Sequence, residues 1–379
     1  MPACNTNLLG VWPLIVAISR SAAGRARIAS AFGLCAPLET AEAAYDLLAY
    51  AQAPWFEMAE GDYPFPSDYI TFAVGPGAYP LPAWPVRVAC NHVGRDFGLS
   101  LRGNTSAVRF TAAVGNVSVD VDWASVTGGP FTDEQLTRSG VLDLVAGLGR
   151  GVGVWYNVSG TMKCHNLTAA TTSNQADPTP PFLVADDGVP ESSFIVDAYA
   201  PDDVGDVCTG SNEGWSRAGG WGPLCCNEGL RLVNTLATGV GRDFYWPPSP
   251  DSRDWNATAI VAAPIGACGQ GYASEGLYGL PTGEGDPWSR WEDDYYGGLR
   301  LGGASNIVFS NGALDPWSAA GVIRGSPNRS LIPLLLDEGA HHLDLMFSTP
   351  ADPPCAAEAR AVEEAAIRQW IVGEPALRW

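Results

Sequence analysis

Two short, continuous apolar runs stand out near the C-terminal end of the sequence. They are Asn306 to Phe309 (N-I-V-F) and Leu331 to Leu336 (L-I-P-L-L-L). Runs of this length without polar alternation are typical of strands buried on both faces of a parallel sheet. Behind them, Ala356 to Ile371 has apolar residues at helical spacing. The order of strand, loop, strand, loop and helix predicts the closing part of a doubly wound α/β sheet.

The preceding part of the chain alternates helical and irregular patterns. Residues 41–53 and 132–149 have the apolar spacing of helices, and Pro54 ends the first of them. Residues 98–129 alternate β-branched runs with Gly, Asn and Ser, which predicts a small hairpin insertion. Between Tyr63 and Pro85, proline and aromatic residues dominate. We expect this segment to be an ordered loop that lines or covers a pocket.

The charge balance of the chain excludes one large class of partners. There are 41 acidic against 21 basic residues, which gives a net charge of -20. This charge repels nucleic acid and anionic membranes, so we expect neither as a partner. No apolar run reaches the roughly 18 residues of a membrane span. The stretch from Leu8 to Ile18 is interrupted by Pro13 and has no basic segment before it, so we expect any targeting signal to precede Met1.

Cysteines and glycosylation sequons both favour a secretory or lysosomal protein. The nine cysteines include no C-x-x-C pair, which argues for dispersed disulfides rather than a zinc ribbon or a thioredoxin-like site. Six Asn-X-Ser/Thr sequons, which matter only in a secretory chain, occur at Asn104, Asn116, Asn157, Asn166, Asn256 and Asn328.

Each of the two predicted strands is followed by a loop that carries candidate catalytic groups. The first loop, S-N-G-A-L-D-P-W, contains Asp315, and the second, D-E-G-A-H-H-L-D-L, contains His341 and His342. Sheets of this class place functional residues at the carboxyl ends of their strands. A carboxylate that accepts one imidazole N–H fixes the tautomer of a histidine, so that the other nitrogen serves as a base. Asp followed by His, one strand apart, is the order of the acid and base in an α/β-hydrolase triad.

Two other readings of these loops remain open. Asp315-Pro316 is also a common turn pair, with the histidines as ordinary loop residues. A metal site built from His341, His342 and Asp344 is disfavoured, because adjacent residues in an extended chain point in opposite directions and the chain has only four histidines. We therefore expect no metal and no cofactor.

Several strings resemble the family of lysosomal prolyl (Pro-Xaa) carboxypeptidase and dipeptidyl peptidase II. The most specific are N-I-V-F-S-N-G-A-L-D-P-W-S-A-A-G-V at 306–322 and E-G-A-H-H-L-D-L at 338–345. Further strings agree upstream, at 55–64 (W-x-x-x-A-x-x-D-Y-P), 81–90 (L-P-A-W-P-V-R-V-A-C), 156–164 (Y-N-V-S-G-T-M-K-C) and 225–228 (C-C-N-E).

The resemblance implies a fold, a domain organisation and an activity. It implies an α/β chain in which residues 1–225 form a mostly helical, disulfide-bonded insertion or lid domain. Residues 226–379 would be the C-terminal part of the α/β-hydrolase sheet. The activity implied is that of a lysosomal, vacuolar or secreted serine exopeptidase that cleaves peptides next to proline. The family also leaves a homodimer possible.

Site residues are carried over from the same resemblance. It implies Asp315 as the acid and His341 as the base, with Trp317, Trp55 and Tyr63 as candidates for binding the substrate. It also implies three disulfides, which join Cys4 to Cys90, Cys35 to Cys164 and Cys226 to Cys268.

The chain departs from the family pattern in one respect. The nucleophilic serine of an α/β-hydrolase lies in a G-x-S-x-G turn, and this sequence has none. We therefore expect a truncated and inactive copy of the peptidase, or alternatively a pseudo-peptidase or peptide-binding secreted glycoprotein. The acid that marks dipeptidyl peptidases is absent from residues 221–224, which favours a carboxypeptidase.

Overall fold

The computed structural model describes residues 2–71, 79–103, 109–122, 125–167, 301–325 and 329–372, together with Tyr295 and Gly297. The chain forms two compact units. The first unit comprises Met1–Pro54 and Ala89–Glu292, and the second comprises Trp55–Val88 and Asp293–Trp379.

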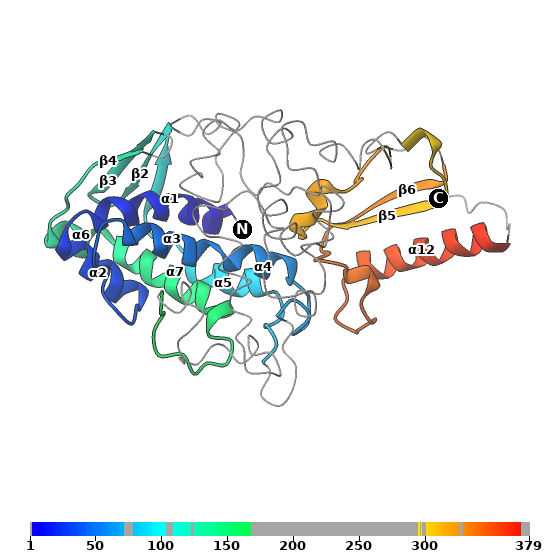
Figure 1. Cartoon of the computed structure of the whole chain (residues 1–379), viewed down its shortest axis with the longest axis horizontal. Coiled ribbons are helices and arrows are strands. Elements are labelled where there is room, and N and C mark those ends of the chain that lie inside the picture. The colour runs from blue at the N-terminus through cyan, green and yellow to red at the C-terminus, as the bar shows by residue number, and fades with distance from the viewer. Residues whose placement is uncertain are drawn as a thin grey trace, which may run out of the picture. The chain divides into compact units, whose positions relative to one another are not determined.

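Helices dominate the described part of the first unit (Figure 1). They are α1 (Pro2–Ser19), α2 (Ala22–Phe32), α3 (Ala43–Gln52), α6 (Asp133–Ser139) and α7 (Val141–Tyr156), and α5 (Pro85–Val93) ends in this unit. Helix α1 packs against α2, α3 and α7 and buries Trp12, Leu14 and Ile15 completely. The apolar stretch near the N-terminus is therefore a core helix in this structure. Among the described residues, no helix is both long and apolar enough to cross a membrane.

The predicted hairpin insertion is a four-stranded antiparallel sheet. Its strands are β1 (Leu99–Arg102), β2 (Arg109–Val114), β3 (Val117–Asp122) and β4 (Ser125–Thr127), in that order across the sheet. Along β3, Val117, Val119 and Val121 are buried, and the alternate residues are exposed. One face of the sheet packs against α1, which explains the period-two pattern of its sequence.

The helix expected at 132–149 is two helices instead of one. Thr132 caps α6 in a capping box with Gln135. Gly140 then adopts a left-handed backbone conformation (φ 80°), which an α-helix cannot continue, and α7 begins at Val141. The sequence pattern missed this break because the apolar spacing continues across Gly140.

Two disulfides lie in the first unit, Cys4–Cys90 and Cys35–Cys164. They are the first two pairings that the family resemblance implies. The third, Cys226–Cys268, falls outside the described residues, as do the sequons at Asn104, Asn256 and Asn328. Of the remaining sequons, Asn116 is exposed in the turn between β2 and β3, and Asn157 and Asn166 are partly exposed.

The second unit contains the parallel strand pair that the apolar runs predict. Strands β5 (Ile307–Gly312) and β6 (Leu331–Leu336) pair in parallel, with Ile307 opposite Leu331. Helix α12 (Pro354–Val372) packs along both strands (Figure 1). The described part of this unit also contains helix α4 (Pro54–Glu60) and three short 3-10 helices, at Leu301–Gly303, Pro316–Ala320 and Leu343–Leu345.

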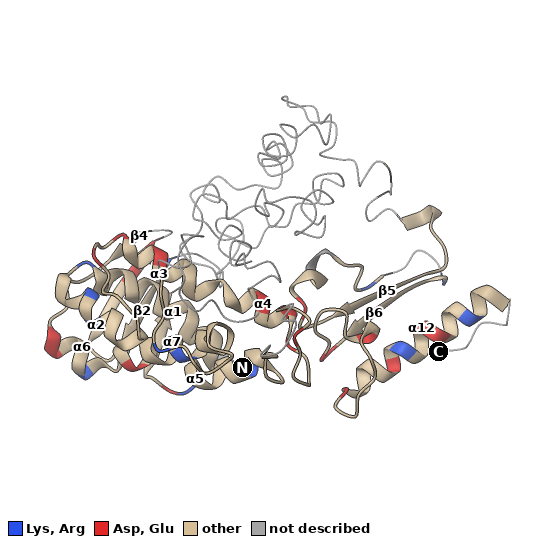
Figure 2. Ribbon diagram, turned by 60° about the horizontal axis from the view of Figure 1, so that its bottom comes forward, with Lys and Arg blue, Asp and Glu red and all other residues tan. Residues whose placement is uncertain are grey.

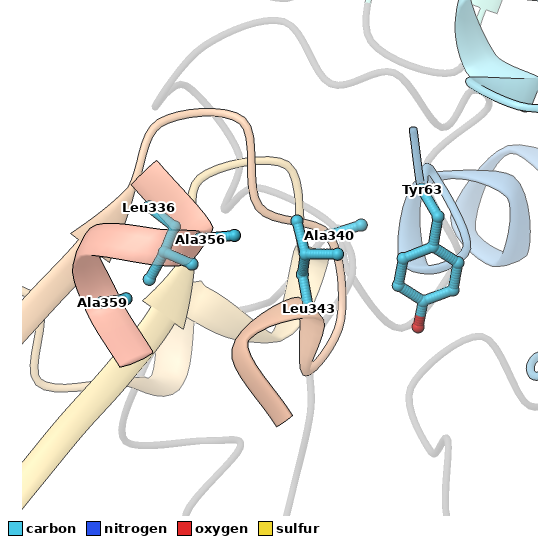
Figure 3. Packing of buried hydrophobic residues seen from close by; sticks show 6 residues of the cluster. All are labelled: Tyr63, Leu336, Ala340, Leu343, Ala356 and Ala359. Carbon is cyan, nitrogen blue, oxygen red and sulfur yellow. The ribbon is translucent and has the colours of Figure 1, made fainter. Parts of the chain in front are cut away.

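A small apolar core holds these elements together (Figure 3). It consists of Tyr63, Leu336, Ala340, Leu343, Ala356 and Ala359. The core therefore joins the end of β6, the loop that follows it, the start of α12 and the segment after α4. Since Ala340 and Leu343 flank the two histidines, packing of this core fixes the position of the histidine loop.

The chain is a mixed α/β protein, as expected. The predicted domain boundary at 225/226 lies outside the described residues and stays a prediction. The structure groups Trp55–Val88 with the C-terminal segment, in the second unit.

Candidate active site

Two glycines bring the loops after β5 and β6 into contact. A Cβ atom on Gly312 would lie 2.3 Å from the carbonyl oxygen of Gly339, so no larger residue fits without displacement. The same carbonyl accepts a hydrogen bond from the backbone N–H of Leu314, at 2.9 Å. Because the strands are parallel, both loops leave the same edge of the sheet. The close approach places the residues that follow each glycine side by side.

Asp315 and His341 form a hydrogen bond across this junction. The distance between Asp315 Oδ2 and His341 Nδ1 is 2.9 Å, and only 9% and 16% of the two side chains are exposed. The other carboxylate oxygen, Oδ1, accepts the backbone N–H of Trp317 at 3.0 Å, which caps the 3-10 helix Pro316–Ala320. The cap fixes the orientation of the carboxylate, and the carboxylate fixes the imidazole.

A second carboxylate lies on the opposite side of the imidazole ring. Glu60, at the end of α4, has its Oε1 atom 3.6 Å from Nε2 of His341. The same oxygen accepts the indole N–H of Trp317 at 3.0 Å. Sequence reasoning missed Glu60, because nothing in its local sequence marks it as a neighbour of residues some 250 positions away.

The backbone of His341 is held at two points by the segment around α4. Its N–H donates to the carbonyl of Glu60 at 3.1 Å, and its carbonyl accepts the hydroxyl of Tyr63 at 2.6 Å. The ring of Tyr63 is fully buried and stacks on Phe65. These contacts fix the position of the histidine before any substrate binds.

Arg360 of α12 supports the histidine loop from the other side. Its guanidinium donates to the carbonyls of Leu343, Asp344 and Met346, at 2.8, 2.8 and 3.2 Å. It also pairs with the carboxylate of Asp352 at 2.5 Å. The sequence places Arg360 in a predicted helix but gives no sign that it binds the loop of the base.

The charges around His341 favour its protonated form. Burial alone would lower its pKa, but the hydrogen bond that the ring donates to Asp315 and the negative charges of Glu60, Asp315 and Asp344 outweigh burial and raise the pKa above 6.5. Burial raises the pKa of Glu60, and Asp315 adds to this effect against the opposing influence of His341 and Trp317. Red segments on the ribbon of α4 in Figure 2 mark acidic residues of this helix.

His342 adopts a left-handed backbone conformation (φ 54°), which corrects one expectation. The argument that the two histidines point in opposite directions assumed an extended chain. The left-handed turn instead places the two rings next to each other, with centroids 3.5 Å apart. The described residues nevertheless contain no group of three or more His, Cys, Asp or Glu side chains arranged for a metal ion.

The three predicted substrate-binding residues occupy different environments. Trp317 is partly exposed and lies 6.2 Å, between ring centroids, from Phe56 and 6.4 Å from His341. Tyr63 and Trp55 are buried, and Tyr63 contacts the backbone of the base. A substrate contact for each of them stays a prediction.

A family model matches the region of the site, and known proteins match most of the chain at low sequence identity. The family model for serine carboxypeptidase S28 matches residues 287–363. The lysosomal Pro-X carboxypeptidase of Homo sapiens is 24% identical over 370 residues, which cover 98% of this chain and 51% of the relative. A prolyl carboxy peptidase like protein 5 from Caenorhabditis elegans is 42% identical over 85 residues, 22% of this chain and 17% of the relative.

The chain thus spans about half the length of the lysosomal carboxypeptidases that it matches. The family match includes both loops that meet at the site, and the similarity to those carboxypeptidases covers nearly all of the chain. The chain is therefore similar to the serine carboxypeptidase S28 family over residues 287–363 and distantly similar to lysosomal Pro-X carboxypeptidase over nearly its whole length.

Proposed function

We propose that this chain supplies the acid and base of a serine-type exopeptidase of α/β-hydrolase architecture that cleaves peptides next to proline. The observation that carries the proposal is the 2.9 Å hydrogen bond between Asp315 and His341, at the ends of two parallel strands. It is the arrangement that nucleophilic acyl transfer requires of its base. The names of the relatives support the choice of substrate.

In this proposal, His341 first accepts and then donates the proton during acylation, the first half of the reaction. Its Nδ1–H donates to Asp315, which leaves the lone pair of Nε2 free to accept the proton of the attacking hydroxyl. The negative charge of Asp315 stabilises the imidazolium that forms. The imidazolium then gives the same proton to the nitrogen of the leaving group, which returns His341 to its neutral form.

The nucleophile is the part of the mechanism that the experiment has to identify. None of the 379 residues lies in a G-x-S-x-G motif. Among the described residues, no serine hydroxyl is hydrogen-bonded to His341. A second candidate function follows from this observation, namely that of a secreted or lysosomal glycoprotein that binds proline-containing peptides without cleaving them.

Further features of the chain fit the first proposal. The ring of Trp317 lies near His341 and next to the ring of Phe56, and both rings are suitable for packing against a proline ring. We assign residues 1–225 to a lid domain and residues 226–379 to the hydrolase domain. The disulfides and sequons favour a lysosomal, vacuolar or secreted location.

The test compares hydrolysis and binding of two peptide sets at acidic pH. One set has a blocked N-terminus and a C-terminal Pro-Xaa pair, and the other has a free N-terminal Xaa-Pro pair. If a nucleophile completes the Asp315–His341 pair, the protein releases Xaa from the first set, loses this activity in His341→Ala and Asp315→Ala, and keeps it in His92→Ala, which changes a histidine of the other unit. Labelling with a fluorophosphonate probe then locates the nucleophile.

Three outcomes decide between the candidates. Release of an N-terminal dipeptide would replace the carboxypeptidase with a dipeptidyl peptidase. Binding of proline peptides without hydrolysis would favour the second candidate function. Hydrolysis that survives both His341→Ala and Asp315→Ala would overturn the assignment of the acid and the base.

A further inference from the structure

The imidazole of His341 lies between two carboxylates. Asp315 contacts Nδ1 at 2.9 Å, and Glu60 lies 3.6 Å from Nε2. One partner is enough to orient an imidazole and fix its tautomer. A carboxylate next to Nε2 is not needed for that purpose, because Nε2 is the nitrogen that must accept a proton during the reaction. The second carboxylate therefore calls for a separate account.

Glu60 is itself held in place. The indole N–H of Trp317 donates to its Oε1 atom at 3.0 Å, and only 15% of its side chain is exposed. The backbone N–H of Trp317 also donates to Asp315, which caps the 3-10 helix, so the two carboxylates are connected through the same residue. These contacts hold the Glu60 side chain in a fixed position, whereas a surface carboxylate is free to move towards a cation.

The surroundings of His341 contain more negative than positive groups. Helix α4 contributes two carboxylates, Glu60 and, one turn before it, Glu57, and the two interact electrostatically. The other titratable side chains that act on this cluster are Asp315, Asp344, His342, Tyr63 and Tyr69. The nearest opposite charge for Glu60 is therefore a protonated His341.

We propose that Glu60 is a positioning residue that acts through His341 by stabilising the proton on Nε2, and so sets the pH above which His341 is free to act as a base. This inference rests on the proposed function and names a residue that sets the pH range in which the proposed peptidase is active. It also assigns a role to a residue outside the Asp-His pair.

The chemistry of the proton follows directly. When the nucleophile attacks, its O–H bond breaks and an Nε2–H bond forms, so the ring gains one positive charge. Glu60 neither gains nor loses an atom in this step. Its negative charge lowers the energy of the imidazolium relative to the neutral ring, both in the intermediate and before the reaction starts. The mutual effects agree with this pairing, because Glu60 raises the pKa of His341, and His341 lowers the pKa of Glu60 against the larger, opposing effect of burial.

Removing the charge of Glu60 while keeping its shape tests the proposal. Glu60→Gln retains an oxygen that can accept the indole N–H of Trp317, so the packing is preserved. The pKa of His341 is measured by NMR titration of the ring in the full chain, with the signals of the four histidines assigned by single substitutions. We expect the pKa to fall in Glu60→Gln and to stay unchanged in Glu364→Gln, which alters an exposed carboxylate on α12.

The wild-type chain gives a second measurement that does not depend on a variant. We expect His341 to keep protons on both ring nitrogens above pH 6.5, the usual midpoint for histidine. Titration of His341 at or below this value, or an equal pKa in Glu60→Gln and Glu364→Gln, would overturn the proposal.

The two proposals fail in different ways. If peptides are not hydrolysed but the pKa of His341 falls in Glu60→Gln, the role of Glu60 stands and the peptidase assignment does not. If peptides are hydrolysed, the acid limb of the pH profile of kcat/KM should move to lower pH in Glu60→Gln. A purely structural role for Glu60 would lower the melting temperature without moving this limb.

Discussion

Gly312 and Gly339 are in backbone contact, and this contact is what allows the acid and the base to meet. A Cβ atom on Gly312 would lie 2.3 Å from the carbonyl oxygen of Gly339, and one on Gly339 would lie 3.2 Å from the Cα atom of Gly312. Neither glycine has a positive φ. Both positions therefore require glycine because a side chain would have no space there, and not because of their backbone conformation.

Gly312→Ala should separate the two loops. The added methyl group meets backbone atoms, which cannot rotate away, so we expect a loss of about 1–3 kcal/mol in the free energy of unfolding. Gly303→Ala is the matched control, because a Cβ atom there meets nothing within 4 Å. Chemical denaturation compares the two variants. Equal stability of Gly312→Ala and Gly303→Ala would show that the contact between the loops is not tight.

Arg360→Met should loosen the histidine loop, which follows β6 and carries His341. The methionine keeps the apolar stem but leaves several backbone carbonyls and the carboxylate of Asp352 without their donor, at a cost of about 3–5 kcal/mol. Arg368→Met removes an exposed ion pair from the same helix and should cost less than about 1 kcal/mol. Thermal unfolding of both variants measures the difference. Similar melting temperatures would contradict the role of Arg360.

His165 should make the first unit sensitive to acid. Burial lowers its pKa to about 4, against a smaller opposing effect of a hydrogen bond that the ring donates to the backbone of Gly149. The unfolded chain binds a proton near pH 6.5 and the folded chain does not, so stability is full above that pH and falls as the pH drops from 6.5 towards 4. The loss amounts to roughly 3 kcal/mol.

Unfolding in urea at several pH values measures this loss. In His165→Gln, which cannot titrate, the decrease between pH 7 and pH 4 should be smaller than in the wild type by about the same amount. An identical decrease in both proteins would show that His165 does not control the acid sensitivity.

The sequence predicts those parts of the site that depend on local patterns. The apolar runs of β5 and β6 mark buried strands, and Asp315 and His341 follow them closely enough for parallel strands to bring them to one edge. The periodicity of α12 also predicts its helix. These inferences succeed because each rests on a few neighbouring residues and on the geometry of parallel sheets.

The parts that the sequence does not predict depend on contacts between distant segments. Glu60 and Tyr63 reach His341 from about 280 residues away, and no spacing rule connects them. Arg360 lies in a helix whose existence is predictable, but the direction of its side chain depends on the loop that it binds. The break at Gly140 was missed because hydrophobic spacing is insensitive to a single left-handed residue.

The central claim is that Asp315 fixes the tautomer of His341, and the nitrogen chemical shifts of the imidazole test it most directly. Above the pKa of His341, the wild-type chain should carry the remaining proton on Nδ1, which donates to Asp315, and leave Nε2 unprotonated. In Asp315→Asn this preference should be lost. A wild-type spectrum with the proton on Nε2 would contradict the assignment of Asp315 and His341 as a catalytic acid and base.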